Sequence, residues 1–155
     1  MSHTPSDLLA GLPPAEAQSV IALGRVVKLD AGDVLFRLGD MADAVYLIRR
    51  GRIALTLPLQ VGGGEQDVFI EERIPGQTLG WSALIPPFRF TLKATAPLET
   101  ELLALPRAPL LDYFAERPHV AYPISLNLAA VIGQRLQVFQ AMWLREMQRL
   151  VNAHA

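Results

Sequence analysis

Short apolar segments separated by glycine-containing turns are the feature of this sequence that most limits its fold. From Arg25 to Leu105, runs of β-branched, aromatic and aliphatic residues alternate with turn residues such as Asp30-Ala31-Gly32-Asp33 and Gly39-Asp40. Short strands at even spacing with turn signals between them are typical of a β-sandwich or barrel. The sequence therefore predicts strands at 26–29, 34–36, 45–48, 52–57, 67–72, 91–96 and 101–105, with a mobile hairpin loop at 61–65.

Helical patterns flank this β region on both sides. A short segment over 8–23 begins again after Pro13-Pro14, since proline is tolerated at the first position of a helix. From Pro109 onward the pattern is helical to the end, with breaks expected at Pro118 and Pro123. A chain of 155 residues is long enough for one domain with a buried core. We therefore expect a single domain over 1–155, made of the helical segment 8–23, a β region over 25–106 and helices over 109–151.

An apolar stripe runs along the last expected helix. With about 100° per residue, six apolar side chains fall in one narrow sector: Ile132, Leu136, Phe139, Trp143, Met147 and Leu150. The opposite side carries the polar residues Gln134, Arg145, Gln148 and Arg149. A narrow seam of this kind is typical of coiled coils, and an exposed one would favour aggregation of a monomer. We expect a homodimer that pairs through 132–151; packing of the stripe onto the chain's own β region is the alternative.

Composition argues against several kinds of enzyme. The sequence has no cysteine, which removes disulfides, thiolate metal sites and a cysteine nucleophile. Its three histidines, His3, His119 and His154, are scattered, so neither a metal-binding cupin nor a Ser-His-Asp enzyme is supported. We therefore expect a non-catalytic protein without a metal or a cofactor.

Charge and hydropathy give an expectation for location. The net charge of −1 provides no overall attraction to DNA or to an anionic membrane. The chain does not begin with a basic segment followed by an apolar core, and no apolar run approaches the roughly 20 residues that cross a bilayer. We expect a cytoplasmic protein with no membrane association.

Three runs of the β region resemble the cyclic-nucleotide-binding domain family. They are AGDVLFRLGD at 31–40, VYLIRRGRI at 45–53 and PGQTLG at 75–80. The run Arg135-Leu136-Gln137-Val138 is similar to the dimer helix of the bacterial catabolite activators. The resemblance implies a mainly β fold with flanking helices: a double-stranded β-helix (β-roll or jelly roll) over 25–106, followed by a long C-terminal dimerisation helix. The activators continue into a helix-turn-helix domain after that helix, so we expect no direct DNA binding here and a separate output protein.

The resemblance also places the family's phosphate-binding cassette between Gly80 and Thr91. In the family, a glycine leads into a one-turn helix whose N–H groups face the cyclic phosphate. A glutamate accepts from the ribose hydroxyl, and an arginine pairs with the phosphate. Here the glycine and the short helix are retained, whereas Trp81 takes the glutamate position and Phe88 the arginine position. The implied ligand site consists of Gly80, Trp81, Ser82, Ala83, Arg89, Phe90 and Thr91.

The altered positions leave several interpretations open. Indole is a donor only, so Trp81 cannot accept from a ribose hydroxyl, and a cyclic nucleotide in the usual pose would bind more weakly. Arg89 lies one residue after the family's arginine position; it is an anion ligand if a bulge re-aims it, and otherwise a surface arginine. Trp81, Phe88 and Phe90 either line an aromatic pocket or fill the space of the nucleotide. Phe139 either stacks on a flat ligand or packs in the core of the dimer seam.

Two functional hypotheses follow from these observations. The first is a sensor or regulatory module that binds a cyclic nucleotide or another small anion between Gly80 and Thr91. Occupancy would be transmitted to the C-terminal helix. The second is a dimeric interaction module that retains the fold and has lost the ligand, which predicts a cassette filled by its own side chains. A module for another ligand class, such as a dicarboxylate or a flat aromatic acid, lies between them.

Overall fold

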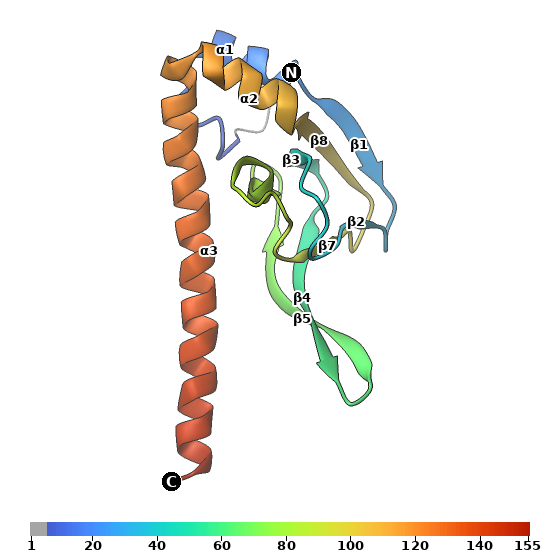
Figure 1. Cartoon of the computed structure of the whole chain (residues 1–155). Coiled ribbons are helices and arrows are strands. Elements are labelled where there is room, and N and C mark those ends of the chain that lie inside the picture. The colour runs from blue at the N-terminus through green and yellow to red at the C-terminus, as the bar shows by residue number, and fades with distance from the viewer. Residues whose placement is uncertain (1–5) are drawn as a thin grey trace.

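The computed structural model describes residues 6–155, and in it a β-roll lies beside one long helix (Figure 1). Residues 1–5, which include His3, lie outside the described part. None of the helices within 6–155 is long and apolar enough to cross a membrane. The elements in chain order are α1 (Pro14–Ile21), β1 (Arg25–Leu29), β2 (Val34–Phe36), β3 (Ala44–Arg50), β4 (Ile53–Val61), β5 (Gly64–Arg73), β6 (Thr78–Leu79), the 3-10 helix η1 (Trp81–Leu84), β7 (Lys93–Thr95), β8 (Thr100–Pro106), α2 (Arg107–Glu116) and α3 (Pro118–Ala153).

The strands form two antiparallel sheets of four strands each. Their orders are β1-β8-β3-β6 and β2-β7-β4-β5. Strands far apart in the sequence, such as β1 and β8, therefore lie side by side, as a jelly roll requires. The fold prediction is confirmed: a mainly β roll with flanking helices and a long C-terminal helix. All seven predicted strands occur; β6 is too short to give a signal of its own.

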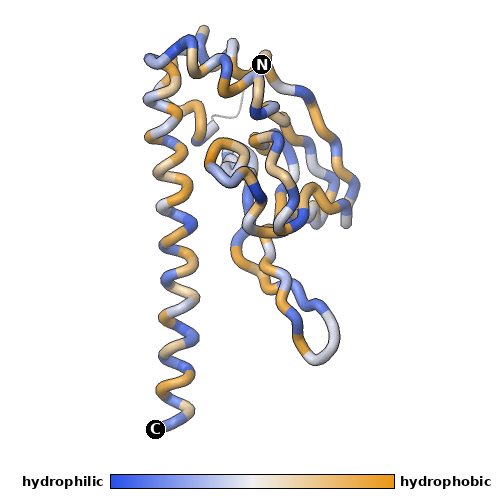
Figure 2. The backbone as a smooth tube through the Cα atoms, in the orientation of Figure 1, coloured by the Kyte–Doolittle hydropathy of each residue, from blue (hydrophilic) through white to orange (hydrophobic). Residues whose placement is uncertain are grey.

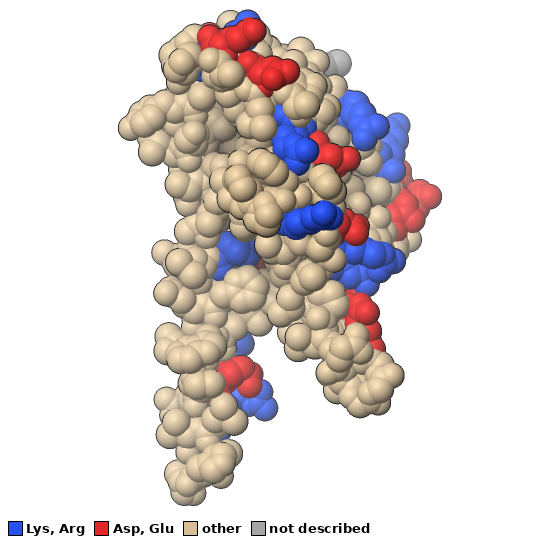
Figure 3. All heavy atoms as spheres, viewed as in Figure 1, with Lys and Arg blue, Asp and Glu red and all other residues tan. Residues whose placement is uncertain are grey.

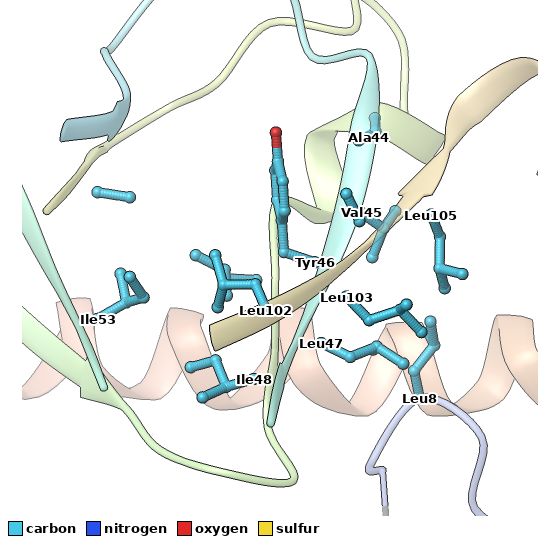
Figure 4. Packing of buried hydrophobic residues seen from close by; sticks show 14 of the residues in the cluster. Leu8, Ala44, Val45, Tyr46, Leu47, Ile48, Ile53, Leu102, Leu103 and Leu105 are labelled. Carbon is cyan, nitrogen blue, oxygen red and sulfur yellow. The ribbon is translucent and has the colours of Figure 1, made fainter. Parts of the chain in front are cut away.

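The core is centred on β3 and β8. The first five residues of β3, Ala44 to Ile48, are all buried. A strand with one solvent-exposed face would alternate between buried and exposed residues, so both faces of β3 are covered here. Figure 4 shows side chains of both strands on either side of the pair, with Leu8 near Leu47 and Leu103. One hydrophobic cluster thus joins the first sheet to residues of the second sheet and of all three helices, among them Ile53, Leu55, Val20, Leu110 and Val120.

The β4–β5 hairpin is longer than the sequence predicted. The strands continue to Val61 and resume at Gly64, so the loop expected at 61–65 is a tight turn. Its central residues, Gly62 and Gly63, have φ values of 55° and 87°. Positive φ at both central positions is what a type I′ turn needs, and glycine adopts it without steric cost. The hairpin consequently projects beyond the roll in the same direction as α3 (Figure 1).

Helix α3 is continuous from Pro118 to Ala153, so the break predicted at Pro123 is wrong. The proline lies in the second turn, where its missing N–H removes one intrahelical hydrogen bond. Its neighbours Val120 and Ile124 are buried in the core, and this packing holds the helix together across the proline. The break at Pro118 is confirmed, because α2 ends at Glu116 and α3 begins two residues later.

Polar contacts fasten the N-terminal segment to the helices. The predicted segment 8–23 is α-helical only in α1, where the hydroxyl of Tyr113 donates to Glu16 at 2.9 Å and His119 Nε2 lies 3.1 Å from the same carboxylate. These two hydrogen bonds, the one with His119 first, lower the pKa of Glu16. The amide of Asn127 donates to two backbone carbonyls of the segment, each at 2.8 Å. These contacts hold the N-terminal part of α3 against the N-terminal segment of the chain.

Candidate ligand site

Gly80 fixes the geometry of the cassette. It follows β6 with a left-handed φ of 79° and precedes η1. A Cβ at this position would lie 3.1 Å from the carbonyl oxygen of Ala44 and 3.3 Å from the ring of Phe90. Glycine is therefore needed both for the backbone conformation and for the close approach to β3. The turn carries Trp81, which is half-buried, and the buried residues Ser82 and Ala83 into the interior of the roll.

A small cavity lies at this turn. Its volume is ≈ 10 Å³, which is room for about one water molecule. Its lining is Phe36, Leu55, Gly80, Trp81, Ser82, Phe90, Thr91, Leu92 and Arg135. The rings of Phe36 and Phe90 are stacked with their centroids 3.7 Å apart, and both side chains line the cavity. Aromatic side chains of the protein itself thus close the cassette.

Most of the predicted ligand residues meet at this cavity. Five of the seven line it: Gly80, Trp81, Ser82, Phe90 and Thr91. Ala83 is fully buried but does not line the cavity. Arg89 is exposed, and its Nη1 donates to the carbonyl of Gly39 at 3.3 Å, while its backbone pairs with Met41. Arg89 does not line the cavity, and its role as an anion ligand stays a prediction.

Phe88, at the family's arginine position, also lies away from the cavity. Its backbone has a φ of 59°, which is uncommon for a bulky residue. The guanidinium of Arg107 lies 4.6 Å from the centre of its ring, a cation–π contact. Of the three aromatic residues singled out from the sequence, only Trp81 and Phe90 take part in closing the cassette.

Among residues 6–155, Arg135 of α3 is the one cation that lines the cavity, and sequence reasoning did not single it out as a ligand residue. It is only 7% exposed, and its Nε donates to Glu71 Oε1 of β5. Burial lowers the pKa of Arg135, and the contact with Glu71 opposes that shift. A signal was present in the sequence: between Pro118 and Leu144, this arginine is the only Asp, Glu, Lys or Arg. A single charged residue in so long an otherwise uncharged stretch indicates a specific partner for that charge.

A second buried arginine lies beside this pair. Arg73 shares the face of β5 with Glu71, because residues two apart in a strand point the same way. It is 4% exposed, and its Nε lies 3.8 Å from Glu71 Oε1, which is too far for a hydrogen bond. Within residues 6–155, its Nε and Nη2 have no hydrogen-bond partner. The cluster of Glu71, Arg73 and Arg135 therefore holds two cations and one anion.

The six seam residues of α3 divide into two groups. Ile132, Phe139 and Met147 are half-buried, whereas Leu136, Trp143 and Leu150 are exposed. Phe139 packs against the hydrophobic core, and stacking on a ligand stays an untested interpretation. Further exposed apolar residues widen the stripe beyond the predicted sector: Tyr122, Leu126, Leu144 and Val151. Figure 2 shows hydrophobic bands along the whole of α3, and Figure 3 shows charged atoms on this view of it mainly near its C-terminal end.

An open apolar groove separates α3 from the β4–β5 hairpin. Its volume is ≈ 760 Å³. The hairpin contributes Leu57, Leu59, Val68 and Ile70, and the helix contributes Leu136, Phe139, Gln140, Met142, Trp143, Leu144 and Glu146. The chain's own roll does not cover this part of the seam. Of the six seam residues, Phe139 is the one for which the structure records packing against the hydrophobic core of the described residues.

Comparison with known proteins places these features in a family. A family model described as cyclic nucleotide-binding domain matches residues 26–117. The cyclic AMP receptor protein of Thermus thermophilus is 31% identical over 132 residues, which are 85% of this chain and 58% of that protein. Among solved structures, the catabolite activator protein of Thermus thermophilus is similar with a TM-score of 0.73 and 28% identity, covering 92% of this chain and 63% of that one. The N-terminal domain of a transcriptional regulator from Streptomyces coelicolor has a TM-score of 0.70 and 26% identity, covering 85% and 92%. The chain thus spans less than two thirds of the receptor and activator proteins.

Proposed function

Because the chain belongs to the cyclic nucleotide-binding domain family, we propose that it is a non-catalytic regulatory module whose cassette binds a small anion. One observation carries the proposal: the guanidinium of Arg135 is buried at a cavity that Ser82 also lines. A guanidinium forms strong, charge-assisted hydrogen bonds with phosphate and carboxylate oxygens. Such bonds are stronger at a buried site of low dielectric than in bulk water, and Arg135 is only 7% exposed. The donors at the cavity therefore suit a compact oxyanion or the anionic group of a larger ligand. The cavity must widen to admit either, because its present volume holds about one water molecule.

The cassette is less suited to a cyclic nucleotide in the family's usual pose. Trp81 cannot accept a hydrogen bond from a ribose hydroxyl, and an unpaired buried hydroxyl costs about 1–3 kcal/mol. The cavity has room for about one water molecule, so the stacked rings of Phe36 and Phe90 would have to move apart. We therefore expect cyclic AMP and cyclic GMP to bind more weakly than they would to a cassette with the family's glutamate and arginine.

Calorimetric titration with inorganic phosphate, cyclic AMP and cyclic GMP tests the proposal. We expect phosphate to bind to the wild type. Arg135→Gln and Ser82→Ala should each weaken it by about tenfold to a hundredfold, since a hydrogen bond to a charged group contributes about 1.5–3 kcal/mol. Arg89→Ala is the matched control, because that arginine is exposed and lies outside the cavity lining. An equal loss with Arg89→Ala would move the site to Arg89, and no heat with any of the three ligands would contradict ligand binding.

A second candidate is a dimeric interaction module that binds no ligand. The closed cassette favours it, because aromatic side chains fill the space in which relatives would hold a ligand. This candidate predicts that anions leave the melting temperature unchanged, whereas a ligand that binds the native state raises it. A screen of melting temperatures with phosphate, dicarboxylates and aromatic acids separates the two candidates and covers the other ligand classes.

We further propose that two copies pair through α3, with the seam Ile132, Leu136, Phe139, Trp143, Met147 and Leu150 at the interface. The open apolar groove and the exposed seam residues support a partner that presents an apolar surface. A second copy presents the same apolar seam, so the contact is self-complementary about a two-fold axis. A cytoplasmic location, a separate output protein and the absence of direct DNA binding stay predictions.

A further inference from the structure

Three charged side chains are packed together where α3 crosses β5. Glu71 and Arg73 project from the same face of β5, and Arg135 reaches them from the helix. Both arginines are more than nine-tenths buried. Arg135 also lines the cassette cavity with Ser82, so the cluster and the proposed anion site share one guanidinium.

Of the two arginines, Arg135 makes a hydrogen bond with the Glu71 carboxylate and Arg73 does not. Oε1 of Glu71 accepts from Nε of Arg135, while Nε of Arg73 stays 3.8 Å from that same oxygen. In the described part of the chain, Arg73 Nε and Nη2 make no hydrogen bond. Buried guanidinium donors are rarely left unsatisfied, because desolvation is then uncompensated. The cluster therefore lacks one negative charge.

A purely structural ion pair would not need Arg73. Burial is the main cause that lowers the pKa of Arg135; Glu71 opposes it, and the positive charge of Arg73 adds to the lowering. An apolar side chain in place of Arg73 would leave the Glu71–Arg135 pair intact without this repulsion. Arg73 has a role if the cluster also exists in a second state, in which an anion from solution is bound and Arg73 pairs with Glu71.

We infer that Glu71 is a built-in competitor for the anion at Arg135, and that Arg73 takes over Glu71 when the anion binds. The inference rests on the proposed function. In the free state, Glu71 ties α3 to β5. In the bound state, the anion pairs with Arg135 beside Ser82, and Glu71 pairs with Arg73 within β5. Two cations then face two anions, and a contact between helix and strand is exchanged for one between helix and cassette.

Titrations with inorganic phosphate test this exchange. The variants are Glu71→Gln, which removes the competitor, and Arg73→Met, which removes the alternative partner of Glu71. Glu72→Gln is the matched control, because this neighbouring carboxylate pairs with Arg52 at 2.9 Å on the surface. Fluorescence of Trp81, which lines the cavity, is read in a Trp143→Phe background together with calorimetry. We expect about tenfold tighter binding for Glu71→Gln, about tenfold weaker binding for Arg73→Met and no change for Glu72→Gln.

The outcomes separate the inference from the proposed function. Equal affinities of the wild type, Glu71→Gln and Arg73→Met would overturn the exchange while leaving the anion site in place. No binding of phosphate to any variant, Glu71→Gln included, would remove the proposed function and the exchange with it. If Glu71→Gln does not fold, the comparison of Arg73→Met with the wild type decides: unchanged affinity overturns the exchange.

Discussion

Trp143→Glu is expected to convert a dimer into a monomer. Trp143 is 62% exposed in the single chain and lies in the middle of the seam of α3, at the edge of the open groove. In a two-fold coiled coil, this side chain would be buried against the partner helix, and the change would place a carboxylate at the same position in both copies. Burying an unpaired charge costs several kcal/mol. We expect the dimer dissociation constant to rise at least about 100-fold.

Light scattering at several protein concentrations measures this effect. Gln134→Glu is the matched control, because it adds the same charge on the opposite, exposed side of the helix. The control should keep the mass of the wild type. A dimer mass that survives Trp143→Glu, or a wild type that is monomeric at high concentration, would contradict pairing through this seam.

Gly80→Val should destabilise the protein more than valine does at a turn glycine such as Gly32, where an added Cβ meets no other atom. The left-handed backbone costs a β-branched residue about 1–2 kcal/mol. The added atoms would also meet Ala44, Tyr46 and Phe90, each within 3.1–3.3 Å of the new Cβ. Overpacking of this kind costs about 1–3 kcal/mol more. We expect a loss of about 2–5 kcal/mol in the free energy of unfolding, measured by urea denaturation.

Gly32→Val separates the two contributions. Gly32 has a similar φ of 93°, but a Cβ there would meet nothing within 4 Å. Its replacement should therefore show the backbone cost alone. Equal losses for Gly32→Val and Gly80→Val would mean that the close approach of the cassette to β3 contributes nothing to stability.

The strands of the roll could be predicted from the sequence because the residues that begin and end each strand are neighbours in the chain. Turn residues such as Gly32 and Gly51 mark the ends of apolar runs, and neither signal depends on the rest of the chain. The predicted ends of helices and strands were wrong where tertiary packing or turn geometry outweighs the local sequence signal. Pro123 stays helical because its neighbours are buried, and the hairpin at Gly62-Gly63 closes as a tight turn because two adjacent glycines adopt positive φ.

The candidate site was predictable only in part, for a related reason. Gly80, Trp81 and Ser82 follow each other in the chain, and their arrangement depends on one turn. The pairing of Arg135 with Glu71 joins residues that are 64 positions apart. It arises only when α3 crosses β5, which no local pattern specifies. Arg89 shows the converse: it is adjacent to the cassette in sequence, yet its side chain is directed to the carbonyl of Gly39.

A crystal structure of the protein soaked with selenate would show whether Arg135 and Ser82 bind an anion. Selenate has the shape and charge of a small tetrahedral oxyanion, and its anomalous scattering identifies it without ambiguity. We expect one strong anomalous peak within hydrogen-bond distance of the Arg135 guanidinium and the Ser82 hydroxyl, with Glu71 moved toward Arg73. A peak at Arg89 alone, or an unchanged Glu71–Arg135 pair with no selenate in the cassette, would contradict it.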